Sequence, residues 1–164
     1  MASPAGSDQP PIPLPILAGV ATLLLLLAGV GLWLATRPAD GPVREIDNRE
    51  LASLVADGVT VVDIREPWEW EQTGVIEGSH LITAFDPQGR LEPDFLPRFA
   101  SLVGPEDEVV LICRTGNRTS FLASALSEQL GYERIRNVTH GILPWIQSGG
   151  SVVACRVEGS VPVC

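Results

Sequence analysis

Short apolar runs alternate along this chain with stretches in which apolar residues recur at helical spacing. Four runs predict β-strands, at residues 59–63, 80–83, 109–113 and 135–138. Five stretches predict helices, at residues 47–56, 67–72, 93–103, 119–130 and 143–148. Strands that alternate with helices predict a parallel sheet covered by helices on both faces, so the expected fold class is α/β.

A different pattern stands near the start of the chain, where residues 16–34 form an apolar run without a charge. Its length is close to the ~20 residues that span the hydrocarbon core of a bilayer. A buried core helix would keep a polar face, and a cleaved signal peptide would begin with basic residues, which residues 1–15 lack. We therefore expect an uncleaved, single-pass transmembrane helix in the lipid bilayer, with a proline-rich tail at 1–15 and a linker at 35–43.

The segment with the clearest chemical signal follows the apolar run at 109–112. That run would deliver Cys113 at the carboxyl end of a strand, where open α/β sheets bind their ligands. The loop continues with Arg114, Thr115, Gly116, Asn117 and Arg118. Backbone N–H groups at the start of the next helix, together with the two arginines, would favour the thiolate of Cys113. An inert core cysteine is the alternative, but it would not need two cations and a glycine beside it.

The spacing from the cysteine to the second arginine separates two kinds of anion-binding loop. Protein tyrosine phosphatases place their phosphate-binding arginine six positions after the cysteine, and that position here is Thr119. In this chain Arg118 comes five positions after Cys113, and the loop resembles the six-residue active-site loop of rhodaneses. The tighter ring of N–H groups suits a sulfur atom or a small sulfur oxyanion and leaves too little room for a phosphomonoester.

Three further segments resemble motifs of the rhodanese family and come in the order that the family has them. They are residues 61–70, 74–79 and 137–145. The second has Val75 where the family usually has a histidine, and the third has His140 where it has a glycine. With the Cys113 loop, the resemblance covers residues 44–153 and implies a single rhodanese domain, which leaves a C-terminal tail at 154–164.

Several conspicuous side chains in these motifs are expected to serve the scaffold. Asp63 and Arg65 end a predicted strand two positions apart, so we assign them a structural role at the sheet edge. The tryptophans of the motifs are expected to be packing anchors: Trp68, Trp70 and Trp145. The two histidines are not assigned a catalytic role, because persulfide transfer needs no base once the cysteine is a thiolate. The histidines and cysteines show no zinc spacing, so we expect no metal and no cofactor.

The resemblance implies a thiosulfate-type sulfurtransferase. The Cys113 thiolate would attack the outer sulfur of a small anionic donor such as thiosulfate, and the persulfide would pass to cyanide, a thiol or a protein acceptor. We expect the two loop arginines to hold the donor's oxygens and the N–H groups between them to stabilise the persulfide. Two alternatives stay open: a persulfide carrier or sulfur-relay module for a membrane partner, and a redox protein that uses Cys155 and Cys164.

Charge bears on the partners and on the compartment. The net charge is −9 and the chain has no lysine, which argues against a nucleic-acid partner. Arginines follow the apolar run and none precedes it, which favours a cytoplasmic domain. A disulfide between Cys155 and Cys164 would instead suit an oxidising compartment, and the motifs resemble those of exported bacterial rhodanese-like proteins. The membrane face stays open, with a slight preference for the periplasmic, extracytoplasmic side.

Overall fold

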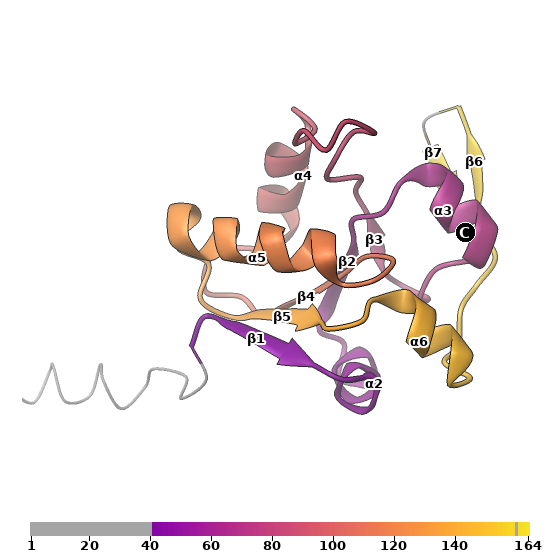
Figure 1. The fold of residues 1–164 in the computed structure, drawn as a ribbon, viewed down its shortest axis with the longest axis horizontal. Helices are drawn as coiled ribbons and strands as arrows, with labels where there is room; N and C mark the ends of the chain where they lie inside the picture. The colour runs from indigo at the N-terminus through magenta and orange to yellow at the C-terminus, as the bar shows by residue number, and fades with distance from the viewer. Residues whose placement is uncertain (1–40, 160) are drawn as a thin grey trace, which may run out of the picture. The chain divides into compact units, whose positions relative to one another are not determined.

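A five-stranded parallel sheet forms the centre of the part of the chain that the computed structural model describes, residues 41–159 and 161–164 (Figure 1). Its strands are β1 (Val43–Ile46), β2 (Thr60–Asp63), β3 (His80–Leu81), β4 (Val109–Ile112) and β5 (Ile135–Val138). They lie in the order β1-β5-β4-β2-β3, so β4 occupies the centre. The predicted parallel sheet is confirmed. The apolar pattern does not predict β1, because this edge strand buries only its last residue.

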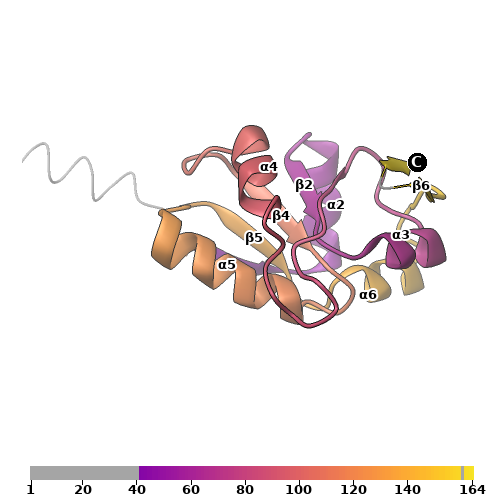
Figure 2. The ribbon, with the colours of Figure 1, turned by 90° about the horizontal axis from the view of Figure 1, so that it is seen from above.

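Helices cover both faces of the sheet, as the alternating pattern predicts (Figures 1 and 2). The helices are α2 (Asn48–Ala56), α3 (Pro67–Thr73), α4 (Phe95–Leu102), α5 (Asn117–Leu130) and α6 (Ile142–Gln147). Alternate residues of β4 enter two separate cores. Leu111 packs in the core that contains Phe99 of α4 and Leu126 of α5, whereas Val110 packs in the core that contains Leu51 of α2 and the ring of α6 Trp145. Because both faces are buried, β4 reads as a continuous apolar run.

The predicted helices within the described residues are present, and local capping explains where they begin. Asp47 accepts a hydrogen bond from the backbone N–H of Glu50 at 2.9 Å, so it caps α2 as expected. The side chain of Glu50 does not return to Asp47 but pairs with Arg44. Helix α5 begins two residues earlier than predicted, at Asn117, because Gly116 adopts a left-handed conformation directly before it. The end of the Cys113 loop is therefore already helical.

The predicted transmembrane helix at residues 16–34, and the tail that precedes it, lie outside the described residues. Within residues 41–159 and 161–164, no helix is both long enough and apolar enough to cross a membrane. The predicted linker at 35–43 is described only at its end, where Val43 already pairs with Ile135 as the first residue of β1.

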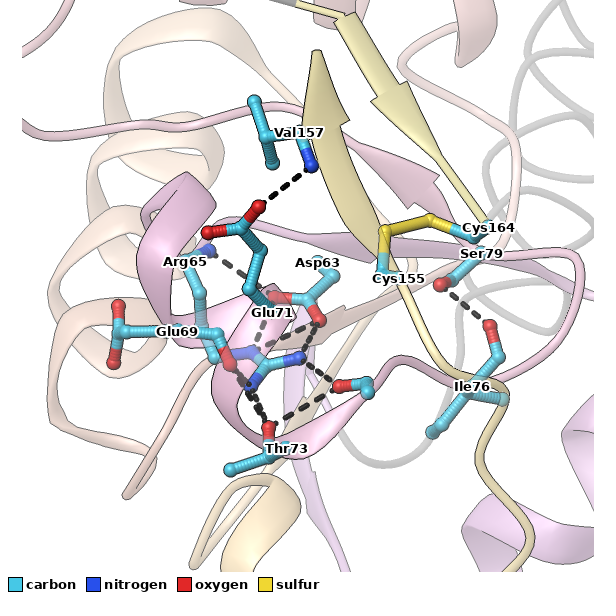
Figure 3. The surroundings of a disulfide bond; sticks show 11 residues. Asp63, Arg65, Glu69, Glu71, Thr73, Ile76, Ser79, Cys155, Val157 and Cys164 are labelled. Carbon is cyan, nitrogen blue, oxygen red and sulfur yellow. Dashed lines mark hydrogen bonds and ion pairs between the residues drawn. A yellow bond between two sulfur atoms is a disulfide. The ribbon is translucent and has the colours of Figure 1, made fainter.

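The C-terminal segment folds back onto the domain. It forms an antiparallel hairpin of β6 (Arg156–Glu158) and β7 (Val161–Val163). A disulfide joins Cys155 and Cys164 at the base of this hairpin (Figure 3). The backbone N–H of Val157 donates to the carboxylate of Glu71 in α3 at 2.8 Å. Cys155 is buried in a small apolar cluster with Trp70 of α3. The hairpin therefore lies against α3, the short helix that borders the candidate site.

Candidate functional site

Cys113 lies directly after β4, at the carboxyl edge of the sheet, and its side chain is 0% exposed. The backbone N–H of Gly116 donates to its sulfur over 3.1 Å. The hydroxyl of Thr119, in the first turn of α5, lies 3.6 Å from the same sulfur. Cys113 is the free cysteine of the chain, since the other two form the disulfide. The Thr119 hydroxyl donates to the carbonyl oxygen of Gly116 at 2.9 Å, so the Gly116 N–H is the group that stabilises negative charge on the sulfur.

Two glycines allow the loop to fit against the rest of the domain. Gly116 has a φ of 90°, and a Cβ at this position would overlap the carbonyl oxygen of Thr139. Gly141 has a φ of 66°, and a Cβ there would overlap the carbonyl oxygen of Cys113. That same carbonyl accepts a hydrogen bond from the N–H of Ile142 at 2.8 Å. The segment that resembles the last family motif thus packs directly behind Cys113, and glycine is required on both sides of the contact.

Arg118 has a buried partner that the sequence analysis missed. Its two terminal nitrogens lie 2.8 and 2.7 Å from the two carboxylate oxygens of Glu69 in α3. The side chain of Glu69 is 3% exposed and that of Arg118 is 30% exposed. Burial alone would raise the pKa of Glu69. Hydrogen bonds from Arg118 and from the backbone of Glu66, together with the positive charges of Arg118 and Arg65, lower it by more, so the pKa lies below its usual value. The positive charge of Arg118, the last residue of the Cys113 loop, is therefore already paired with a carboxylate.

The other loop arginine also leans toward α3. A terminal nitrogen of Arg114 donates to the side-chain oxygen of Gln72 at 3.3 Å. Its guanidinium lies over the ring of Trp68, 5.9 Å from the ring centroid. The expectation that Trp68 is a packing anchor is wrong, because its side chain is 52% exposed, whereas Trp70 and Trp145 are buried as predicted. Trp68 instead supports Arg114 at the rim of the site.

Arg65 ties the end of β2 to the end of α3 (Figure 3). Its Nε and one terminal nitrogen bind the carboxylate of Asp63, with the shortest contact at 2.6 Å. Its remaining N–H groups donate to the hydroxyl of Thr73 and to the carbonyl oxygens of Glu69 and Gly74. A guanidinium has five N–H donors, and here all five have acceptors inside the domain. The pair therefore fixes α3, and with it the carboxylate that holds Arg118.

The remaining predicted site residues lie around the sulfur without equivalent roles. Thr115 and Asn117 are exposed on the outer side of the loop, and Gly116 between them is buried. Among the described residues, the backbone N–H that donates to the Cys113 sulfur is that of Gly116. The sequence pattern assigns Thr119 no role in the site, yet its hydroxyl contacts the Cys113 sulfur. The structure thus places the predicted residues in one loop, but only some of them contact the Cys113 sulfur.

Comparison with known proteins agrees with this geometry. Residues 47–148 match the family model of the rhodanese-like domain. A sulfurtransferase from Allochromatium vinosum is 35% identical over 114 residues, which cover 68% of this chain and 96% of that protein. Thiosulfate sulfurtransferase 18 from Arabidopsis thaliana is 29% identical over 109 residues, which cover 63% of this chain and 79% of that protein. A longer relative from Mycobacterium bovis is 28% identical, and the chain spans 62% of its length.

A solved structure shows the same fold. The crystal structure of a rhodanese-related protein from Thermoplasma volcanium matches with a TM-score of 0.52 and 28% sequence identity. The match covers 67% of this chain and 97% of that chain. The likeness therefore extends over nearly the whole of a rhodanese-related chain.

Proposed function

Because the chain belongs to the rhodanese-like domain family, we propose that it is a sulfurtransferase that carries sulfane sulfur as a persulfide on Cys113. The observation that carries this proposal is the free, buried Cys113 at the end of the central strand, with the N–H of Gly116 on its sulfur. A donor of this kind stabilises a thiolate, which is the reactive form of a cysteine. The short spacing to Arg118 supports sulfur rather than phosphate as the transferred group.

The reaction proceeds in two displacements. The Cys113 thiolate attacks the outer sulfur of thiosulfate, the S–S bond of the donor breaks, and sulfite leaves with the electron pair. A thiolate acceptor then attacks the outer sulfur of the Cys113 persulfide, and Cys113 leaves as a thiolate. Arg114 and the exposed side of Arg118 bind the oxygens of the donor. The Gly116 N–H stabilises the negative charge on the Cys113 sulfur at the start and at the end of the cycle.

Turnover of thiosulfate with cyanide tests the proposal. The full-length wild-type chain in detergent is expected to form thiocyanate, and Cys113→Ser is expected to reduce the rate to background, because a hydroxyl does not form a persulfide. Replacing both disulfide cysteines with serine is the matched control, since it removes the disulfide and its two sulfur atoms but keeps the Cys113 thiol. Activity that survives Cys113→Ser would overturn the proposal.

A persulfide carrier for a membrane partner is the second candidate. The complete burial of Cys113 favours it, because burial would shield a persulfide from adventitious thiols. Discharge of the loaded protein separates the two functions. Rapid loss of the persulfide to a small thiol supports the enzyme, whereas a stable persulfide with negligible turnover on any small acceptor supports the carrier.

We also propose that residues 16–34 anchor the domain to a membrane, with the domain on the extracytoplasmic side. The apolar run supports the anchor, and the disulfide between Cys155 and Cys164 supports an oxidising compartment. Protease treatment of sealed inside-out vesicles tests the face. The proposal expects the domain to be protected there and digested after the vesicles are permeabilised. Digestion in sealed inside-out vesicles would place the domain on the cytoplasmic side instead.

A further inference from the structure

A pocket of about 440 Å³ opens beside the Cys113 loop. It is lined by residues from α5, from the start of α3 and from the loop after β3, among them Glu66, Phe85, Asp86, Pro87, Arg118 and Phe121, together with Asn117. Two of these, Asn117 and Arg118, close the loop that holds the nucleophile. The volume lies in the range of about 300–1,000 Å³ that is usual for small-molecule sites. We call this hollow the Phe121 pocket.

The apolar part of the Phe121 pocket consists of two aromatic rings and a proline. Phe121 lies on the second turn of α5, and 69% of its side chain is exposed, although the residue type is usually buried. Its ring centroid lies 6.2 Å from that of Phe85, with the rings tilted at 55°. Phe85 is itself buried and belongs to the core beneath the sheet face. The pair therefore presents an aromatic surface to a ligand in the pocket.

The charged groups of the pocket are already paired within the domain. Asp86 accepts hydrogen bonds from the backbone and the side chain of Arg90. Glu66 accepts one from the ring nitrogen of Trp68 at 3.1 Å. Arg118, the cation among the described lining residues, is held by the buried carboxylate of Glu69. Arg90 therefore balances Asp86 and Glu69 balances Arg118. The pocket has no surplus positive charge, and the carboxylate of Glu66 disfavours an anionic ligand.

We propose that the Phe121 pocket binds the sulfur acceptor, and that this acceptor is a thiol with an uncharged apolar or aromatic substituent. The inference rests on the proposed function and names the acceptor class for it. The substituent packs on Phe121 and Phe85, which brings its sulfur to the Cys113 loop. The thiol loses its proton to solvent, its sulfur attacks the outer sulfur of the persulfide, and the S–S bond electrons return to Cys113. The product is the persulfide of the acceptor.

Discharge of the loaded protein tests the inference. The full-length chain is loaded with thiosulfate, desalted and mixed with benzyl mercaptan or with mercaptoethanesulfonate at equal concentrations of thiolate. Wild-type protein is expected to discharge at least about tenfold faster to the aromatic thiol, as for one apolar group in a hydrophobic pocket. Phe121→Ala is expected to remove most of that preference while the rate of loading by thiosulfate stays unchanged.

Leu130→Ala is the matched control, because Leu130 is another exposed apolar residue of the same helix and lies at its far end. It is expected to keep the wild-type preference. Equal discharge to the two thiols, or a preference that survives Phe121→Ala, would overturn the acceptor assignment while loading still occurs. A chain that thiosulfate does not load at all would overturn the proposed function itself, so the two failures are distinguishable.

Discussion

Two ion pairs hold α3 in place, and they differ in how far the arginine side chain is exposed. Both side chains of the Asp63–Arg65 pair are 1% exposed, and every guanidinium donor has an acceptor within the domain. In the Glu69–Arg118 pair the carboxylate is also buried, at 3% exposed, but the arginine side chain is 30% exposed. The first pair is confined to holding the scaffold. The second joins the same helix to the loop that contains Cys113, so a change in its charge is expected to act on binding of the proposed donor.

Breaking the buried pair should have the largest effect on stability. Arg65→Ala leaves the buried carboxylate of Asp63 without its charged partner, although the backbone N–H of residue 65 still donates to it. We expect a loss of about 3–5 kcal/mol in the free energy of unfolding. Urea unfolding of the detergent-solubilised chain, followed by tryptophan fluorescence, measures it. Arg90→Ala is the control, because Arg90 belongs to an exposed pair, and we expect only a small change. A loss for Arg65→Ala no greater than for this control would contradict the scaffold role.

The disulfide hairpin supports α3 from another side and should matter less. Replacing both Cys155 and Cys164 with serine removes a cross-link between residues nine positions apart, and we expect a loss of about 2–3 kcal/mol in the free energy of unfolding. Loading of Cys113 by thiosulfate should persist, because Arg65 still holds α3. Loss of loading at a temperature where the variant remains folded would show that the hairpin, rather than Arg65, positions the site.

Changing the charge of the second pair should act mainly on substrate binding. Glu69→Gln leaves Arg118 with an unbalanced positive charge beside the loop, so we expect the KM for dianionic thiosulfate to fall about fivefold, a change of about 1 kcal/mol. The KM for a monoanionic thiosulfonate should fall less. A purely structural role for Glu69 predicts no difference between the two donors. A rise in the KM for thiosulfate would show that the carboxylate is needed to place Arg118.

The pH dependence of stability offers the smallest and most specific test of the same pair. Folding lowers the pKa of Glu69 below its ordinary value of 4.5. The contribution of Glu69 to the free energy of unfolding is therefore fully present above pH 4.5. It is lost as the pH falls through the lower pKa of the folded state. We expect the difference in unfolding free energy between wild type and Glu69→Gln to shrink as the pH is lowered through that window. A difference that stays constant would contradict the lowered pKa.

Features encoded locally in the sequence could be predicted, and those that depend on tertiary contact could not. The loop from Cys113 to Arg118 is contiguous, so its spacing alone favours sulfur chemistry. Glu69 is 49 residues from Arg118, and their pairing exists only because α3 and α5 meet at the carboxyl edge of the sheet. Glu69 stands between two tryptophans in a short acidic helix, which gives no sign that its carboxylate faces inward.

The edges of the domain were harder to predict for a different reason. β1 has two adjacent charged residues between two apolar ones, which gives no strand alternation, and it becomes a strand by pairing with β5. The hairpin strands have three residues each. Such short strands on either side of Gly159 are a weak sequence signal for a hairpin. The disulfide and the contact with α3 hold the hairpin in place. The central strands were predictable because burial on both faces leaves long apolar runs.

The central claim is that Cys113 carries the transferred sulfur, and intact mass measurement of the thiosulfate-treated chain tests it most directly. The wild-type chain is expected to gain the mass of one sulfur atom and to lose it again when a thiol is added. Cys113→Ser is expected to gain nothing, although its other two cysteines are unchanged. A sulfur adduct of equal yield on Cys113→Ser, or none on the folded wild-type chain, would contradict the account.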